Sequence, residues 1–166
     1  MSGSEIESAN PLAAEAVAAL KATGLTVATA EATTGGLLGH QLTDVPGSSS
    51  VFVIGVAPYW NEVKVRLGVP EAVLREHGAV SAEAAEALAI AVRSWSGADI
   101  GLAETGIAGP GGASEERPAG LFYIAITDGN GVTSQRFEFK DDRTGNRLAC
   151  AEAALRLLVR RLHASG

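Results

Sequence analysis

Helical and extended segments alternate through the first two thirds of the sequence, and this alternation constrains the fold more than any other feature. Short strands are expected over residues 25–30, 51–57 and 98–104, because each is a brief apolar run bounded by glycine, proline or polar residues. Helices are expected between them. Parallel strands cannot be joined by a tight turn and need a crossover, which a helix supplies. The alternation therefore predicts an α/β chain with parallel strands.

Capping residues and glycines mark the helix boundaries. Asn10 followed by Pro11 is a typical N-cap and first-turn pair, and the helix that they begin is expected to end before Gly24. Ser81 precedes an alanine-rich helix that ends before Gly97. The other helical segments are expected over residues 35–45, 60–67, 70–77 and 143–163.

The last two strands form a predicted hairpin. Residues 121–127 and 132–139 flank the sequence DGNG, which is typical of a tight turn between antiparallel strands. A sheet that contains both this hairpin and parallel strands is mixed. We therefore expect a three-layer α/β/α sandwich with a mixed sheet, formed as a single domain by residues 10–164 after a flexible tail over residues 1–9.

Composition and charge argue against several classes of protein. The formal net charge of −6 disfavours a protein that binds the phosphate backbone of nucleic acid, which needs a basic face. No uninterrupted apolar run reaches the roughly 18 residues needed to span a bilayer, and the N-terminal sequence lacks the basic-then-apolar order of a signal peptide. The single cysteine, Cys150, suits a reducing compartment. We expect a soluble cytoplasmic protein without a nucleic-acid or membrane partner.

Several named motifs fail when they are tested. The dinucleotide-binding pattern fails because Ser114 follows Gly109 and Gly111 where a third glycine is required, and the P-loop fails because Gly112 and Ala113 replace lysine and serine or threonine. The nucleophile elbow GxSxG is also missing. The histidines and the cysteine lack metal-ligand spacing: His40, His77, His163 and Cys150. No metal site is expected.

Two segments follow predicted strands at the position where open α/β sheets usually bind ligands. These are residues 31–36 and the glycine-rich residues 105–120. Gly35 and Gly36 would let backbone N–H groups approach an anion or a developing oxyanion. The simpler interpretation is that these glycines only permit a tight turn from strand to helix.

Tyr59 and Lys64 follow another predicted strand and enter a short helix. A lysine near an apolar strand end can have a lowered pKa and act as a base, and a nearby phenol can orient or donate. The alternative is an ordinary solvated lysine on a helix surface.

An ordered set of short segments carries a resemblance to a known family. The segments are AEATTGG, PGSSSVF, YWNEVK, EHGAVS, TGIAGPGG and RPAG. In register they resemble the C-terminal domain of the competence/damage-inducible CinA family, over about residues 8–162. That domain also occurs as a standalone nicotinamide-nucleotide amidohydrolase. The resemblance implies a three-layer α/β/α fold, often a homo-oligomer. It also implies hydrolysis of nicotinamide mononucleotide to nicotinate mononucleotide and ammonia, in NAD salvage, without a metal or organic cofactor.

Family members typically read ESCTGG and YSNEAK, and this sequence departs from both patterns. The resemblance makes Lys64 the base and Tyr59 its assistant, but the nucleophilic serine corresponds to Ala32, whose methyl group cannot attack a carbonyl. Thr33 replaces the cysteine of the first motif, and Trp60 replaces the serine of the second.

Two ways around the missing serine are open. Thr33 or Thr34 could act as a displaced nucleophile, although a neighbouring residue points elsewhere. Alternatively, Lys64 could activate water while Gly35 and Gly36 stabilise the oxyanion. Glu104 adds a further difference, because it stands where the family commonly has a small or hydroxyl residue.

Substrate binding is expected from residues around the same segments. A guanidinium suits a nucleotide phosphate, and the resemblance points to Arg143, although an ion pair with Asp141 or Asp142 would be a simpler role. Trp60 could fill the pocket or stack on a pyridine ring. The full expected binding set is Thr34, Gly35, Gly36, Ser48, Ser49, Thr105, Gly106 and Arg143.

The sequence leaves three functions open. The first expectation is a degenerate amidohydrolase-like protein, a pseudoenzyme that binds a pyridine nucleotide with impaired or lost catalysis. An active amidohydrolase with an altered mechanism is the alternative, and a non-enzymatic partner-binding protein is the third.

Overall fold

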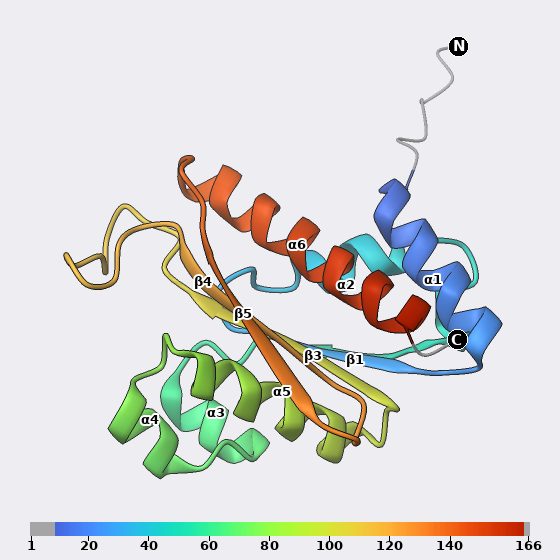
Figure 1. The fold of residues 1–166 in the computed structure, drawn as a ribbon, viewed down its shortest axis with the longest axis horizontal. Coiled ribbons are helices and arrows are strands. Elements are labelled where there is room, and N and C mark those ends of the chain that lie inside the picture. The colour runs from blue at the N-terminus through green and yellow to red at the C-terminus, as the bar shows by residue number, and fades with distance from the viewer. Residues whose placement is uncertain (1–8, 165–166) are drawn as a thin grey trace.

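The computed structural model describes residues 9–164, and its central feature is a five-stranded mixed sheet (Figure 1). The strand order is β2-β1-β3-β4-β5. The strands are β1 (Val27–Glu31), β2 (Phe52–Val56), β3 (Ile100–Gly106), β4 (Leu121–Thr127) and β5 (Val132–Glu138). β1 pairs in parallel with both β2 and β3, whereas β4 pairs antiparallel with β3 and with β5. The predicted parallel strands and hairpin are confirmed.

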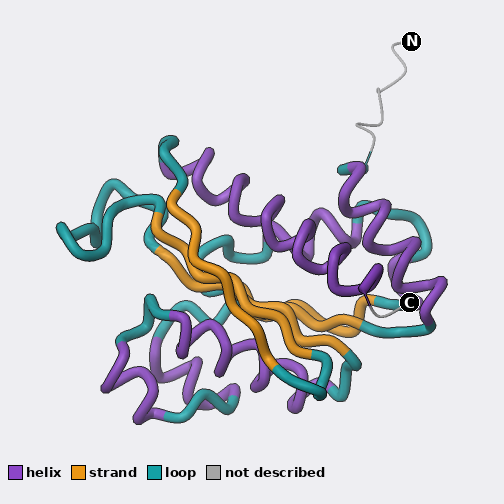
Figure 2. The backbone as a smooth tube through the Cα atoms, in the orientation of Figure 1, coloured by secondary structure: helices purple, strands orange, loops and turns teal. Residues whose placement is uncertain are grey.

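Helices cover both faces of the sheet, as Figures 1 and 2 show. One face carries α1 (Pro11–Thr23), α2 (Leu37–Thr43) and α6 (Arg143–Ala164). The other carries α3 (Asn61–Leu67), α4 (Glu71–His77) and α5 (Ala82–Ser96). The expected three-layer α/β/α sandwich is therefore confirmed. The tail expected over residues 1–9 lies, except for Ala9, outside the described residues.

Local capping explains why most helices begin and end where the sequence predicts. The side chain of Asn10 accepts a hydrogen bond from the N–H of Leu12 at 2.9 Å, and the Ser81 hydroxyl accepts one from Ala84 at 3.1 Å. These bonds satisfy N–H groups that have no partner inside the helix. Helix α2 begins at Leu37, two residues later than expected, because Gly35 and Gly36 have φ angles of 65° and 104°.

Different residues fill the two sides of the sheet. Large side chains pack between the sheet and α1, α2 and α6, among them Leu20, Leu38, Phe122 and Leu158. The opposite side is dominated by alanines, because α5 approaches β3 so closely that a Cβ at Gly101 would meet the carbonyl oxygen of Ala89. This packing fixes the sheet between two helical layers, with the carboxyl ends of β1 and β3 at one edge.

No helix within residues 9–164 is both long and apolar enough to cross a lipid bilayer.

Candidate functional site

The candidate site lies at the carboxyl ends of the parallel strands. Glu31 at the end of β1 is the register partner of Glu104 in β3, and a turn over residues 32–36 leads from β1 into α2. The loop that follows β3 projects from the same edge as the beginning of α6 (Figure 1). Arg143 Nη1 donates to the carbonyl oxygen of Gly109 in that loop at 2.9 Å. The fold therefore brings the two predicted ligand-binding segments together.

Ala32 sits at the position that the family resemblance assigns to the nucleophile. Its side chain belongs to the alanine-rich cluster on the α5 side of the sheet, and the residue is only 6% exposed. The backbone N–H of Ala32 donates to the carbonyl oxygen of Glu104 at 3.2 Å. The backbone is thus held in place, but its side chain offers no atom that can form an acyl intermediate.

The neighbouring hydroxyl groups already have partners. Thr33 Oγ1 donates to the carbonyl oxygen of Gly106 at 3.1 Å and accepts from the Gly106 N–H at 2.9 Å. Thr34 Oγ1 is buried and lies 2.7 Å from Glu31 Oε2. Neither hydroxyl is hydrogen-bonded to Lys64. The geometry therefore speaks against Thr33 or Thr34 as a replacement nucleophile, because each proton is committed to a backbone or carboxylate oxygen.

Lys64 is a buried lysine rather than a solvated residue on a helix surface. Only 4% of it is exposed, and its Nζ donates to the carbonyl oxygen of Tyr59 at 3.1 Å and to Asn61 Oδ1 at 3.2 Å. Burial lowers the pKa of Lys64, while the charges of Glu104 and Glu62 act in the opposite direction. A lysine in this state is suited to accept a proton.

The aromatic pair before α3 is exposed. Trp60 is 72% exposed, so its ring does not fill a pocket in the chain. Tyr59 is also exposed, and its hydroxyl lies 3.5 Å from Nη2 of Arg143. Arg143 makes no ion pair with Asp141 or Asp142, both of which lie within the described residues. This arrangement leaves the guanidinium facing the phenol and the glycine-rich loop.

Backbone N–H groups of the turn point mainly at buried carboxylates. Gly36 N donates to Glu31 Oε2 at 3.1 Å, and the N–H groups of Thr33 and Thr34 donate to Glu104 Oε1 at 2.7 and 2.8 Å. The expectation that Gly36 would offer its N–H to an oxyanion is therefore not met. Gly35 is the member of the glycine pair that could still do so.

Arg147 lies one helical turn after Arg143, and the structure gives it a role that its spacing does not predict. Its Nε donates to the carbonyl oxygen of Thr33 at 3.2 Å, and its Nη2 donates to that of Thr34 at 2.7 Å. Sequence reasoning also missed Glu31 and Glu104 as supporting residues of the site. The signal available for Glu31 was a carboxylate placed shortly before a helix start, where such groups are stabilised.

Ser48 and Ser49 do not lie in this cluster, contrary to expectation. They belong to a short 3₁₀ turn (Ser48–Ser50) that precedes β2. Immediately after it, the carbonyl oxygen of Val51 accepts from the N–H of Val27, the first residue of β1. Both serines therefore lie at the amino end of the parallel strands, opposite the candidate site.

Thr105 and Gly106 lie at the expected edge, but both are engaged in the scaffold. Thr105 Oγ1 donates to the carbonyl oxygen of Ala79 at 2.6 Å, and Gly106 pairs with the hydroxyl of Thr33. A Cβ at Gly106 would overlap the ring of Phe122. These residues hold neighbouring segments against β3 rather than presenting free groups.

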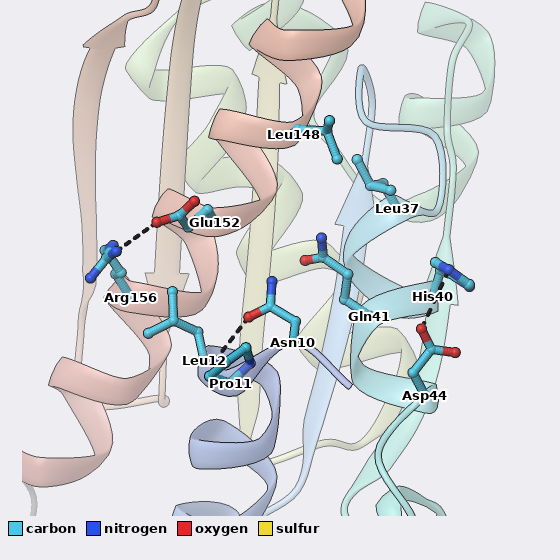
Figure 3. Close-up of a pocket in the computed structure, with 10 residues that line it drawn as sticks. All are labelled: Asn10, Pro11, Leu12, Leu37, His40, Gln41, Asp44, Leu148, Glu152 and Arg156. Carbon is cyan, nitrogen blue, oxygen red and sulfur yellow. Dashed lines mark hydrogen bonds and ion pairs between the residues drawn. The ribbon is translucent and has the colours of Figure 1, made fainter. Parts of the chain in front are cut away.

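A pocket of about 590 Å³ lies elsewhere, between α1, α2 and α6 (Figure 3). It is lined by Asn10, Pro11, Leu12, Leu37, His40, Gln41, Asp44, Leu148, Glu152 and Arg156. Polar side chains of this lining contact one another, since Arg156 forms an ion pair with Glu152 and His40 Nε2 lies 3.4 Å from Asp44 Oδ2. None of the predicted site residues lines this pocket, so it is separate from the candidate site.

Within residues 9–164, no three histidine, cysteine, aspartate or glutamate side chains gather closely enough to hold a metal ion.

Comparison with known proteins gives one consistent result. A family model described as the CinA C-terminal domain matches residues 9–162. A CinA-like protein of Geobacter sulfurreducens is 48% identical over 140 residues, which are 84% of this chain and 34% of that protein. One from Geotalea uraniireducens is 45% identical over 141 residues, with the same coverage of both chains. The chain thus spans about a third of the length of these relatives.

Solved structures agree with the sequence matches. The competence/damage inducible protein CihA from Agrobacterium tumefaciens superposes with a TM-score of 0.88 at 38% identity, covering 98% of each chain. A protein of the competence-damaged protein (CinA) superfamily from Klebsiella pneumoniae superposes with a TM-score of 0.89 at 29% identity, covering 92% of this chain and 96% of that one.

Proposed function

The chain belongs to the CinA C-terminal domain family, and on this premise we propose that it binds a pyridine nucleotide without covalent catalysis. The site is the edge formed by the carboxyl ends of β1, β2 and β3. The ligand class is nicotinamide mononucleotide or a closely related small nucleotide. The amide hydrolysis of the related amidohydrolases is lost or strongly impaired.

One observation carries the proposal: the turn after β1 is fully built, yet no free nucleophile stands on it. Covalent hydrolysis requires an oxygen that attacks the carbonyl carbon of the amide while a base removes its proton. Ala32 has no such oxygen. The hydroxyl groups of Thr33 and Thr34 are bonded to Gly106 and to Glu31, so that freeing either would break the contacts that shape the turn.

Side chains that could bind a nucleotide lie around the turn that lacks a nucleophile. Arg143 uses one N–H on Gly109 and one at long range on Tyr59, which leaves further donors for an anionic ligand. A planar guanidinium binds phosphate oxygens through paired hydrogen bonds. Trp60 offers an exposed ring on which a pyridine could stack. These features support binding of an anionic nucleotide with a planar base.

An active enzyme with an altered mechanism is the second candidate, and Lys64 is the observation that favours it. Its pKa is lowered by burial, so an uncharged amine could remove a proton from water that attacks a bound amide. Such a route lacks the covalent intermediate. Losing the nucleophile of a related catalytic apparatus costs several orders of magnitude in rate, on the order of 10⁴ to 10⁶.

A thermal-shift titration with nicotinamide mononucleotide tests binding. A ligand that binds only the folded state stabilises it by about 2.7 kcal/mol at a hundred times its dissociation constant, which raises the melting temperature by several degrees. Arg143→Ala should abolish most of this shift. Arg75→Ala is the matched control, because Arg75 is an exposed arginine on α4 whose ion pair with Glu76 is away from the site.

Two results would contradict the proposal. The first is the absence of any shift at millimolar nucleotide, which would favour a partner-binding protein. The second is release of ammonia at the median enzyme turnover, about 10 per second, which would show that catalysis is intact.

A further inference from the structure

Two glutamates lie side by side beneath the turn that carries the candidate site. Glu31 and Glu104 are register partners at the ends of β1 and β3, and they are 0% and 1% exposed. Both carboxyl groups lie close to the hydroxyl of Thr34, at 2.7 Å for Glu31 Oε2 and 3.0 Å for Glu104 Oε1. Two buried like charges at this separation would repel each other strongly.

Glu31 has the partners that a charged carboxylate needs. Its Oε2 accepts from Gly36 N at 3.1 Å and Leu38 N at 2.8 Å, and its Oε1 accepts from Gly39 N at 2.8 Å. These N–H groups belong to the beginning of α2, where the helix dipole also favours a negative charge. Both oxygens of Glu31 therefore have N–H partners, whereas among the described residues only one oxygen of Glu104 does.

Glu104 has a different environment. Its Oε1 accepts from the N–H groups of Thr33 and Thr34, but its Oε2 is fully buried and has no hydrogen-bond partner among the described residues. The Thr34 hydroxyl carries a single proton, which the shorter contact gives to Glu31. The 3.0 Å contact between Thr34 Oγ1 and Glu104 Oε1 is therefore the weaker of the two, and Glu104 Oε2 still has no donor among the described residues.

Within residues 9–164, no cationic side chain is hydrogen-bonded to Glu104. Lys64 on α3 interacts with Glu104 through electrostatics, but its Nζ is hydrogen-bonded to Tyr59 and Asn61 instead. Arg147 on α6 faces the carbonyl groups on the turn instead of the carboxyl group.

The other titratable neighbour does not supply a charge either. Burial raises the pKa of the Cys150 thiol on α6 well above its usual value, so it stays neutral. Burial likewise raises the pKa of Glu104 to about 7, against the hydrogen bonds from Thr33 and Thr34, which lower it.

We propose that Glu104 is held as an uncharged carboxylic acid beneath the turn over residues 32–36, because a second buried charge beside Glu31 would lack donors at Oε2. The turn is thereby a proton-dependent element of the site. Ionisation of Glu104 places a second negative charge beside Glu31 and weakens the folded state. Because its free oxygen is buried, Glu104 is a positioning residue and does not contact a ligand.

The pH dependence of the melting temperature tests this proposal without any ligand, so the result is independent of the proposed function. Folding raises the pKa of Glu104 from 4.5 to about 7, so the folded state binds more protons than the unfolded state between these values. Stability is therefore lost as the pH rises through this window. We expect the melting temperature of the full chain to fall by roughly 5–10 °C across it.

Two variants distinguish the contribution of Glu104 to the pH dependence of stability from that of other residues. Glu104→Gln mimics the uncharged acid, so this part of the pH dependence should disappear. Glu116→Gln is the control, because Glu116 is an exposed glutamate in the loop after β3, and this variant should keep the wild-type profile. Parallel profiles for the wild type and Glu104→Gln would overturn the proposal.

A second measurement on the wild type covers the case in which Glu104→Gln does not fold. Carbon-13 NMR of the glutamate carboxyl groups should show one group that titrates near the value given above for Glu104. An infrared band of a protonated carboxylic acid should persist to neutral pH. If every glutamate in the folded protein has lost its proton by about pH 6, the proposal is wrong.

Discussion

The turn after β1 and the segment between β2 and α3 meet at the same site but are built in opposite ways. The turn is buried, and its N–H groups, carbonyls and hydroxyls are bonded to Glu31, Glu104 and Arg147. The segment presents Tyr59 and Trp60 to solvent. The difference teaches that the turn is fixed by many buried hydrogen bonds, whereas the exposed segment makes few contacts with the rest of the chain.

The largest effect should come from restoring the nucleophile on the preserved turn. Because Lys64 and the turn are in place, Ala32→Ser should raise ammonia release from nicotinamide mononucleotide by about a thousandfold or more over the parent chain. Ala57→Ser adds a hydroxyl at an exposed position near the same edge and should have no effect. Ammonia release could stay at the level of the parent chain in Ala32→Ser and also in the double variant Ala32→Ser/Trp60→Ser. The turn would then not be a catalytic scaffold, and the contrast between the turn and the exposed segment would be wrong.

Removing a buried carboxylate should have the next largest effect, on stability. Glu31→Ala leaves three N–H groups at the start of α2 without partners, and we expect a loss of about 3 to 5 kcal/mol in the free energy of unfolding. Urea denaturation measures it. A loss below about 1 kcal/mol would mean that the buried network does not define the turn.

A smaller loss is expected where a hydroxyl joins the turn to β3. Thr33→Val removes the groups that satisfy the N–H and carbonyl of Gly106, and this should cost about 1 to 2 kcal/mol. Thr133→Val on the exposed side of β5 is the matched control and should be near neutral. Equal effects of the two changes would show that the hydroxyl of Thr33 does not support the site.

The smallest effect on stability should come from the exposed segment. Trp60→Ser should change the free energy of unfolding by no more than about 0.5 kcal/mol, because most of the ring contacts solvent. The same variant should weaken binding of nicotinamide mononucleotide if the ring stacks on the ligand. A large loss of stability would place Trp60 with the scaffold and remove the contrast between the two regions.

Local signals made most of the fold predictable. Asn10 and Ser81 cap helices through bonds within three residues, and the DGNG sequence joins β4 to β5 as the local turn pattern predicts. The candidate site was harder to predict, because the residues that hold it in place are far apart in the sequence. Neither the burial of Lys64 nor the contact of Arg147 with Thr33 can be deduced from spacing along the chain.

The misplacement of Ser48 and Ser49 has a physical lesson. They precede β2, whereas Tyr59 and Lys64 follow it, and the two ends of a parallel strand lie on opposite edges of the sheet. The predicted topology therefore already separated the serines from the site. Glu104 is the reverse case, because only the three-dimensional structure shows that its Oε2 is buried without a hydrogen-bond partner among the described residues.

The hydrogen bonds from Arg147 to the turn cannot form until late in the synthesis of the chain. The two carbonyls that it binds lie 114 and 113 residues earlier in the chain. A ribosome delivers the N-terminal strands first. The nascent chain can thus form β1 long before the guanidinium emerges. The turn over residues 32–36 consequently gains its two hydrogen bonds from Arg147 only after α6 has been synthesised.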